Sequence, residues 1–127
     1  SLWRFQARSD SSSHFIGGAM PTRQSKPMYI IIWAYQVKSE HLANFVEIYS
    51  NDGAWAKLFG KSEGYLATEL LHDETDTLRF VTIDRWVSAA SYLNFKAQWQ
   101  AEYNALDAHC EGMTEQEVLI GRYSQPI

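Results

Sequence analysis

Tyr65-Leu-Ala-Thr-Glu-Leu-Leu71 and Leu78-Arg-Phe-Val-Thr-Ile-Asp-Arg-Trp86 are two strand-like runs that decide the fold of this chain. Both are rich in β-branched and aromatic residues, and the polar link His72-Asp-Glu-Thr-Asp-Thr77 between them contains turn formers. A helix start follows at Ser88. The order is therefore strand, turn, strand, helix, and the two runs are expected to pair as a β-hairpin.

Four residues of the second run lie on one face, because side chains alternate along a strand. They are Phe80, Thr82, Asp84 and Trp86. This face combines an apolar ring, a hydroxyl, a carboxylate and an indole, and pure cores rarely contain that mixture. The sequence therefore places a candidate functional site on this face.

A strand and two helices are expected before the hairpin. The run from Met28 to Val37 is too apolar for a solvated edge and predicts a central strand. Ser39 is a good N-cap for a first helix, which the break at Asn51-Asp52-Gly53 ends. A second, short helix is expected to stop near Gly60.

A single long helix, capped by Ser88, is expected after the hairpin. Its apolar residues recur at three- and four-residue intervals and form one stripe. The members of the stripe are Tyr92, Phe95, Trp99, Tyr103 and Leu106. Residues Glu117 to Tyr123 predict a last strand. The resulting order, β-α-β-β-α-β, predicts an α+β ferredoxin-like fold with a four-stranded antiparallel sheet and helices packed on one face.

Size and composition fit one domain preceded by an arm. The chain has 127 residues, of which 46% are hydrophobic and 14% aromatic, and this is enough for a real core. Residues 28–127 are expected to form the domain. Residues 1–27 combine a serine-rich run with a glycine pair and two prolines, and we interpret them as a retained N-terminal arm.

Charge is distributed unevenly between the arm and the domain. The net charge of the chain is −4, yet residues 1–27 contain four basic residues and one acidic residue. Scattered cations do not form a phosphate-binding stripe, and an acidic domain repels nucleic acid, so nucleic-acid binding is disfavoured. A basic arm that docks on its own acidic domain or on a second copy fits the pattern better.

Membrane insertion, disulfide bonding and metal binding find no support in the sequence. The apolar run from Ile30 to Ala34 is far shorter than the roughly 18 residues that a membrane span needs. The single cysteine, Cys110, cannot form an intrachain disulfide, and no spacing of His and Cys resembles a zinc site. These features predict a cytoplasmic protein without a metal.

The sheet face that points away from the helices is also apolar. In a monomer it would expose Ile30, Ile32, Ala34, Val81 and Ile83 to water. Uncovered apolar area of more than a few hundred Å² is unusual in a monomer. We therefore predict a homodimer in which two sheets stack face to face.

Asp84 is the first candidate for a catalytic group. A carboxylate in the middle of a strand is costly to bury unless it is paired or hydrogen-bonded, and Arg122 and His72 are candidate partners. Asp84 is then either a structural group, in an ion pair or as a helix-capping acceptor, or a base or substrate anchor. His72, which follows the first run, is either a proton shuttle or a solvated turn residue.

Aromatic residues form the candidate ligand-binding surface. The chain carries more rings than a small core requires, and this suits a flat aromatic ligand between sheet and helices, although core packing accounts for most rings as well. The candidate wall residues are Trp33, Tyr35, Trp55, Phe59, Trp86 and Trp99. Arg79 and Arg122 are candidate counter-charges for a substrate anion.

Four stretches of the domain form a recognisable set: Trp33-Ala-Tyr-Gln-Val37, Phe45 to Phe59, Gly64-Tyr-Leu66 and Thr82-Ile-Asp-Arg-Trp86. In these stretches the chain, over roughly residues 28–124, resembles the antibiotic biosynthesis monooxygenase family of small dimeric α/β-barrel proteins. The resemblance implies a dimeric α/β barrel with a pocket between the helices and the sheet of each subunit. In some members it also implies oxidation of an aromatic, polyketide-like substrate by O₂ without a metal, a flavin or another cofactor.

Haem-degrading relatives have a pattern that this chain lacks. They use an asparagine in the first strand, a tryptophan at the end of the third strand and a histidine in the following helix. Trp86 matches the tryptophan, but Ile32 or Trp33 occupies the asparagine position and Lys96 lies near the histidine position. The chain is therefore not expected to degrade haem.

Three functions are compatible with these residues. The first is a cofactor-independent monooxygenase-like enzyme that oxidises a small aromatic or quinol-like substrate, with Asp84 or His72 as the base. The second is a non-catalytic homodimer of the same fold that binds a small ligand or acts in a stress response. The third is an interaction module that uses the basic arm to bind an acidic partner.

Overall fold

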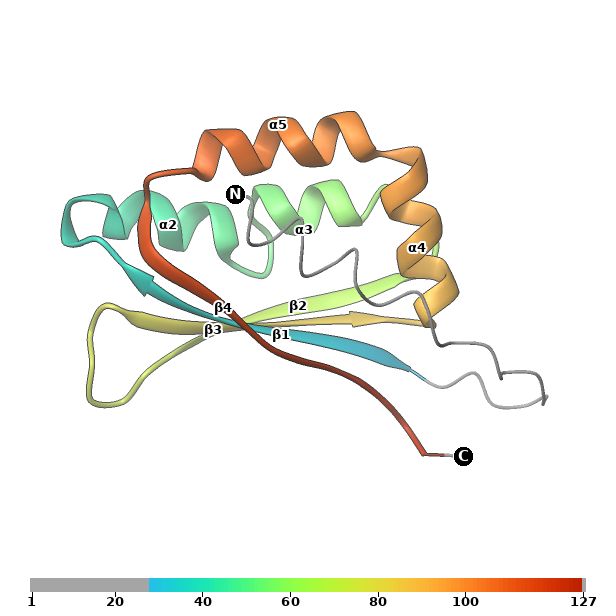
Figure 1. Ribbon diagram of the computed structural model, residues 1–127, viewed down its shortest axis with the longest axis horizontal. Helices are drawn as coiled ribbons and strands as arrows, with labels where there is room; N and C mark the ends of the chain where they lie inside the picture. Colours follow the sequence, from blue (N-terminus) through green and yellow to red (C-terminus); the bar gives the residue numbers. More distant parts are fainter. Residues whose placement is uncertain (1–27, 127) are drawn as a thin grey trace.

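The computed structural model describes residues 28–126. The predicted arm, residues 1–27, lies outside the described residues, as do the roles proposed for it. Helices are interspersed between the four strands along the chain (Figure 1). In chain order the elements are β1 (Tyr29–Val37), the 3₁₀ turn η2 (Ser39–His41), α2 (Leu42–Tyr49), α3 (Ala54–Phe59), β2 (Tyr65–His72), β3 (Arg79–Trp86), α4 (Ala89–Gln98), α5 (Gln100–Cys110) and β4 (Thr114–Ser124).

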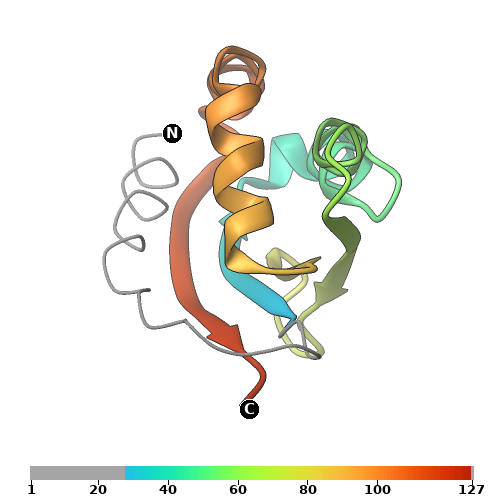
Figure 2. The same cartoon turned by 90° about the vertical axis from the view of Figure 1, so that its right-hand side faces the viewer.

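The four strands form one antiparallel sheet in the order β2-β3-β1-β4. Figure 1 shows all the helices on one side of this sheet, and Figure 2 shows β2 and β4 at its two edges. The two central strands, β1 and β3, are therefore those whose helix-facing side chains are covered most completely. This arrangement confirms the predicted α+β ferredoxin-like fold.

The predicted hairpin is present as β2 and β3. The two strands pair from Tyr65 opposite Trp86 to His72 opposite Phe80. The link between them is held by Asp73, whose Oδ1 accepts hydrogen bonds from the backbone N–H groups of Thr75 and Asp76 at 2.8 and 2.9 Å. The Asp73 carboxyl group thus accepts hydrogen bonds from backbone N–H groups that have no backbone acceptor within the tight link.

A bulge at the start of β2 changes which residues face the helices. Tyr65 lies opposite Trp86, but the next paired residue, Ala67, lies opposite Arg85. The extra residue turns Tyr65 toward the helices and leaves Leu66 48% exposed. Strict alternation from Thr68 would place Leu66 on the helix-facing side, and the bulge prevents this.

The region after the hairpin contains two helices where one was predicted. The chain leaves helical geometry at Trp99, with φ −113° and ψ 28°, so α4 ends and α5 begins there (Figure 1). The predicted cap is present, since Ser88 Oγ accepts a hydrogen bond from the backbone N–H of Ser91 at 3.1 Å. Because of the break at Trp99, the two helices run in different directions (Figure 1).

The first helix also begins differently from the prediction. Lys38 occupies the cap position, Ser39 opens the turn η2, and no side-chain hydrogen bond caps α2. The link to α3 passes through Gly53, where a Cβ atom would lie 2.4 Å from the backbone oxygens of Glu47 and Ile48. Only glycine fits that close approach.

The core is an aromatic layer between the sheet and the helices. Its fully buried side chains include Trp33, Tyr35, Phe45, Phe59, Trp86, Tyr92, Phe95 and Tyr103. Ring pairs connect the layer throughout, from Tyr35 on β1 to Tyr103 on α5. Offset and edge-to-face ring pairs of this kind add to the stabilisation from burial alone.

The opposite face of the sheet carries exposed apolar side chains. Leu71, Val118 and Tyr123 are each between 43% and 48% exposed, and Ile32 and Ile83 are half-buried. Ala34 was expected to be exposed with them, but it is buried. Its neighbours across the sheet on both sides are valines, Val81 and Val118, and these cover its small side chain.

Candidate functional site

Asp84 is a buried carboxylate in the centre of the sheet. It lies on β3 between Thr68 of β2 and Ile31 of β1, and its side chain is only 3% exposed. Thr68 Oγ1 donates a hydrogen bond of 2.9 Å to Asp84 Oδ1. This bond compensates part of the cost of removing the carboxyl group from water.

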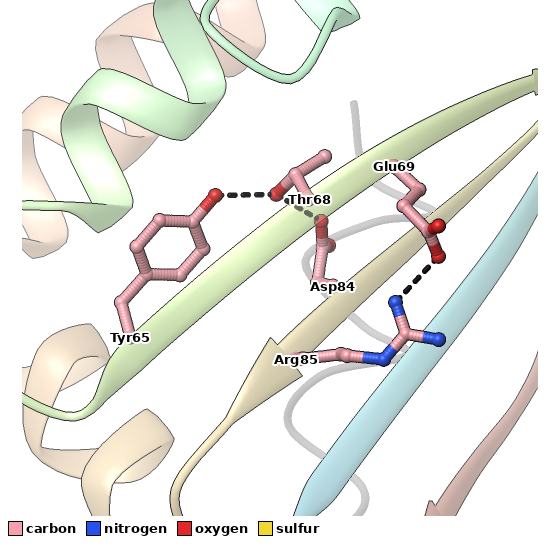
Figure 3. Close-up of polar contacts among 5 residues, drawn as sticks. All are labelled: Tyr65, Thr68, Glu69, Asp84 and Arg85. Carbon is pink, nitrogen blue, oxygen red and sulfur yellow. Dashed lines mark hydrogen bonds and ion pairs between the residues drawn. The ribbon is translucent and has the colours of Figure 1, made fainter.

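Tyr65 extends this contact toward the start of β2. Its hydroxyl donates a 2.7 Å hydrogen bond to Thr68 Oγ1, which in turn donates to Asp84 (Figure 3). Burial raises the pKa of the Tyr65 phenol above its ordinary value; the bond to Thr68 lowers this pKa, and the charge of Asp84 raises it. The phenol is therefore protonated at neutral pH and acts as the donor.

Trp86 lies two residues beyond Asp84 on the same face of β3. Its indole is fully buried and is surrounded by four rings, with centroid distances between 5.3 and 5.5 Å. These rings belong to Phe59, Tyr65, Tyr92 and Phe95. Within residues 28–126, Trp86 Nε1 has no hydrogen-bond partner, so this buried donor can still bind an acceptor.

A second polar contact lies one step along the same face of the sheet. Tyr35 on β1 and Thr82 on β3 are joined by a hydrogen bond of 3.2 Å between their hydroxyl oxygens. Trp33 lies directly opposite Thr82 and is 1% exposed. The predicted residues Trp33, Tyr35, Asp84 and Trp86 are therefore all on the helix-facing side of the two central strands.

Three other predicted wall residues belong to the helical layer. Trp55 and Phe59 lie on α3, and the Trp55 ring contacts the Tyr103 ring at 5.1 Å. Trp99 lies at the junction of α4 and α5, where Lys61 Nζ is 5.1 Å from the centre of its ring. The Phe59 ring contacts the Trp86 ring at 5.5 Å, whereas Trp99 lies at the far end of α4 from Ser88.

The structure does not bring His72 to Asp84. His72 is exposed at the hairpin end of β2, where it stacks on Phe80 with a centroid distance of 4.4 Å. Its Nε2 is 2.9 Å from the backbone oxygen of Thr77. Three residues of β2 lie between His72 and Thr68, so the contacts of His72 belong to the turn.

The two candidate arginines occupy different faces. Arg79 precedes Phe80 on β3 and therefore faces away from the helices, with Val81 and Ile83. Arg122 on β4 lies opposite Ile31, which is also the neighbour of Asp84 on β1. Arg122 and Asp84 are thus separated by the width of one strand.

An ion pair marks the opposite face of the hairpin. Arg85 and Glu69, the neighbours of Asp84 and Thr68 in sequence, pair across the two strands (Figure 3). Both side chains are partly exposed, so the pair adds little to stability. The Arg85–Glu69 pair therefore lies on the outer face of the hairpin, and the Thr68 hydroxyl and Asp84 carboxyl groups lie on the helix-facing side.

Tyr65 and Thr68 are site residues that sequence reasoning did not select. Thr68 is a hydroxyl residue in a largely apolar run, and its position opposite Asp84 follows once the hairpin register is known. Tyr65 gave no such signal, because its orientation depends on the bulge.

Neither a metal-binding cluster nor a membrane-spanning helix occurs in the described part of the chain. Among residues 28–126, no three His, Cys, Asp or Glu side chains are grouped closely enough to hold a metal ion. Over the same residues, no helix has both the length and the apolarity to cross a membrane.

Sequence comparison identifies the family. The family profile described as antibiotic biosynthesis monooxygenase matches residues 28–103, which is more than half of the chain. The chain belongs to the antibiotic biosynthesis monooxygenase family. Among curated protein sequences, none matches it.

Solved structures share the fold at low sequence identity. A Nitrosomonas europaea protein named as an antibiotic biosynthesis monooxygenase is 17% identical, with a TM-score of 0.61 over 82% of this chain and 95% of that one. A Pseudomonas aeruginosa protein is 16% identical, with a TM-score of 0.61 over 84% and 100%. A mutant of SnoaB, a cofactor-independent oxygenase from Streptomyces nogalater, is 15% identical, with a TM-score of 0.55 over 81% and 96%. At these identities the similarity shows the fold.

Proposed function

We propose that this protein is a cofactor-independent monooxygenase that oxidises a small aromatic or quinol-like substrate between the helices and the sheet. The observation that carries the proposal is the buried Asp84 carboxyl group, held by a hydroxyl group within an aromatic layer. Membership of the antibiotic biosynthesis monooxygenase family supports it. So does the shared fold with SnoaB, whose own description is that of a cofactor-independent oxygenase.

Asp84 is assigned the role of base. A phenol or quinol must lose a proton before its electron-rich anion can react with O₂, and a carboxylate shielded from water is a stronger base than one in solution. His72 was the alternative base, but its contacts tie it to the hairpin turn. The proton therefore passes to Asp84.

Trp86 is assigned to bind an oxygen atom of the substrate. Its indole N–H is buried, and leaving such a donor without an acceptor costs about 1–3 kcal/mol. A carbonyl or phenolate oxygen would satisfy it, and the surrounding rings would contact the flat faces of the ligand. Trp33, Tyr35, Trp55, Phe59 and Trp99 are the further proposed wall residues, and Arg122 is the proposed counter-charge.

A homodimer is part of this proposal. The outer sheet face exposes Leu71, Val118 and Tyr123 around half-buried isoleucines. Stacking this face on a second copy would remove that apolar surface from water and close each subunit's sheet. Arg79 lies on the same face, so we reassign it from substrate binding to this interface.

Oxygen uptake with a panel of anthrones and quinols tests the enzymatic proposal. The protein is expected to consume O₂ above the rate of autoxidation, and Asp84→Asn is expected to lower kcat by about 10²–10⁴-fold, the usual contribution of a positioned base. His72→Gln should retain the activity, since His72 lies at the turn. Uptake at the background rate with every substrate, or full activity in Asp84→Asn, would refute the assignment.

The tight packing of the aromatic layer favours a second candidate, a non-catalytic ligand-binding dimer. Trp86 and Tyr92 are completely buried, and their rings are 5.3 Å apart, so the layer is already well filled around the proposed site. Calorimetric titration with the same compounds separates the two candidates. Binding without O₂ uptake supports the second candidate, and turnover supports the first.

A further inference from the structure

We propose that Thr68 and Tyr65 form a proton path that connects the buried carboxyl group of Asp84 with the surface of the protein. This inference rests on the proposed role of Asp84 as the base. A base buried at 3% exposure must return its proton before the next turnover, and water does not reach it freely. The three side chains supply a route through the protein instead.

The contacts join in a single line of oxygen atoms. Thr68 Oγ1 accepts a hydrogen bond from the Tyr65 hydroxyl at 2.7 Å and donates one to Asp84 Oδ1 at 2.9 Å (Figure 3). Both distances are those of strong O–H···O bonds. Hydroxyl groups both donate and accept, so each of the two can receive a proton on one side and release one on the other.

Exposure increases along this line. Asp84 and Thr68 are 3% and 4% exposed, whereas Tyr65 is half-buried. Tyr65 is the first residue of β2, and of the three residues it is the one that is not buried. The line therefore leads outward from the carboxyl group.

The fold fixes this alignment at three points. Sheet pairing places Thr68 directly opposite Asp84, and the bulge before Ala67 turns Tyr65 to the same side. The Tyr65 ring is then held between two others, with centroid distances of 5.7 Å to Phe59 and 5.4 Å to Trp86. A bulge that re-aims one side chain is a common device next to active sites.

The transfer is balanced in protons alone. A substrate O–H bond breaks, and its proton forms an O–H bond on Asp84. The Thr68 and Tyr65 hydroxyl groups then rotate, so that protonated Asp84 donates to Thr68 Oγ1, Thr68 donates to the Tyr65 oxygen and Tyr65 donates to water. The Asp84 proton moves to Thr68 Oγ1, the Thr68 proton moves to the Tyr65 hydroxyl oxygen, and the Tyr65 proton moves to water. Rotation of both hydroxyl groups back restores the resting hydrogen bonds, in which Tyr65 donates to Thr68 and Thr68 donates to Asp84. The three side chains end in their starting states, one proton has travelled from substrate to solvent, and no oxidant or reductant takes part in these steps.

A purely structural role for the same hydrogen bonds makes a different prediction. Hydroxyl groups that only stabilise ionised Asp84 would shift the pH at which it becomes protonated when they are removed. They would not change how fast a proton reaches it. In our proposal Tyr65 and Thr68 act through Asp84 by carrying its proton, and the rate of proton transfer is the readout that distinguishes this role from a purely structural one.

The test is a rapid pH-jump experiment followed by infrared spectroscopy on the full chain. The carbonyl band of protonated Asp84 is identified by its loss in Asp84→Asn. Thr68→Val and Tyr65→Phe keep the side-chain shapes and remove one hydroxyl each, and each is expected to slow protonation of Asp84 by about tenfold or more. Thr68→Ser should restore the rate, and Tyr123→Phe, a phenol on the outer face of β4, should leave it unchanged.

Equal rates in the parent protein and in either hydroxyl-deficient variant would overturn the proposal, even if the protonation midpoint moves. The outcome is independent of turnover. Slower protonation of Asp84 in the two variants, without any O₂ uptake by the parent protein, would support the proton path and refute the proposed function. O₂ uptake that depends on Asp84, together with unchanged protonation rates in the variants, would support the function and refute the path.

Discussion

Thr68 and Asp84 face each other on adjacent strands, and a 2.9 Å hydrogen bond joins their side chains beneath the helices. The bond places a hydroxyl group against a carboxyl group that is almost fully shielded from water. Its two residues come from opposite strands of the hairpin and are sixteen positions apart. The hairpin register is therefore what creates the centre of the candidate site.

Removing the Thr68 hydroxyl should destabilise the fold. Thr68→Val takes away the bond to Asp84 and the acceptor of Tyr65. Losing a buried hydrogen-bond partner of this kind lowers the free energy of unfolding by about 1–3 kcal/mol. We expect a loss near the upper end of this range, because the acceptor is a carboxyl group. Urea unfolding followed by circular dichroism measures the loss. Thr77→Val, an exposed site in the hairpin link, is the control and should change the free energy of unfolding by less than about 0.5 kcal/mol.

The element order of this fold could be predicted from the sequence because it depends on local signals. Alternation in the run ending at Trp86, the cap at Ser88 and the break before Ala54 each act within a few residues, and each is present in the structure. The shared face of Asp84 and Trp86 followed from the same alternation. These signals do not require knowledge of what lies across the sheet.

The remaining features depend on contacts that no local pattern encodes. The bulge adds one residue to β2 between Tyr65 and Ala67. A shift of one residue moves the side chains that precede the bulge to the opposite face of the sheet, so Tyr65 points toward the helices. The break at Trp99 contains neither glycine nor proline, the residues that usually indicate one. The Tyr65–Thr68–Asp84 line requires both the register and the bulge, so only the structure reveals it.

The ionisation of Tyr65 should weaken the fold at high pH. The pKa of this phenol is raised in the folded state, above an ordinary value of 10.0, chiefly by burial. Its contribution is therefore fully present below pH 10 and is lost as the pH rises through the higher folded pKa. Urea unfolding at pH 8 and at pH 10.5 should show a larger loss in the parent protein than in Tyr65→Phe. An equal loss in both proteins would contradict this assignment.

Gly53 should resist substitution because of backbone crowding. A Cβ atom there would lie 2.4 Å from two backbone oxygens, whereas at Gly60 the nearest heavy atom would be 3.2 Å away. Gly53→Ala must therefore move the link between α2 and α3, and overpacking of this kind costs about 1–3 kcal/mol. Gly60→Ala is the matched control and should cost clearly less. Thermal unfolding of the two variants compares them directly, and an equal effect would show that the link relaxes without strain.

The outer sheet face should determine the oligomeric state. Val118 lies on this face at 43% exposure, and Val46 lies on α2 in the helical layer at 37% exposure. Val118→Lys places a charge where two sheets would meet, and burying an unpaired charge is far more costly than exposing it. Light scattering coupled to gel filtration should give a dimer for the parent protein and for Val46→Lys, and a monomer for Val118→Lys. Circular dichroism checks that the variant chains remain folded. A monomeric parent protein, or a dimer that tolerates Val118→Lys and dissociates with Val46→Lys, would place the interface elsewhere and leave the apolar sheet face to another partner.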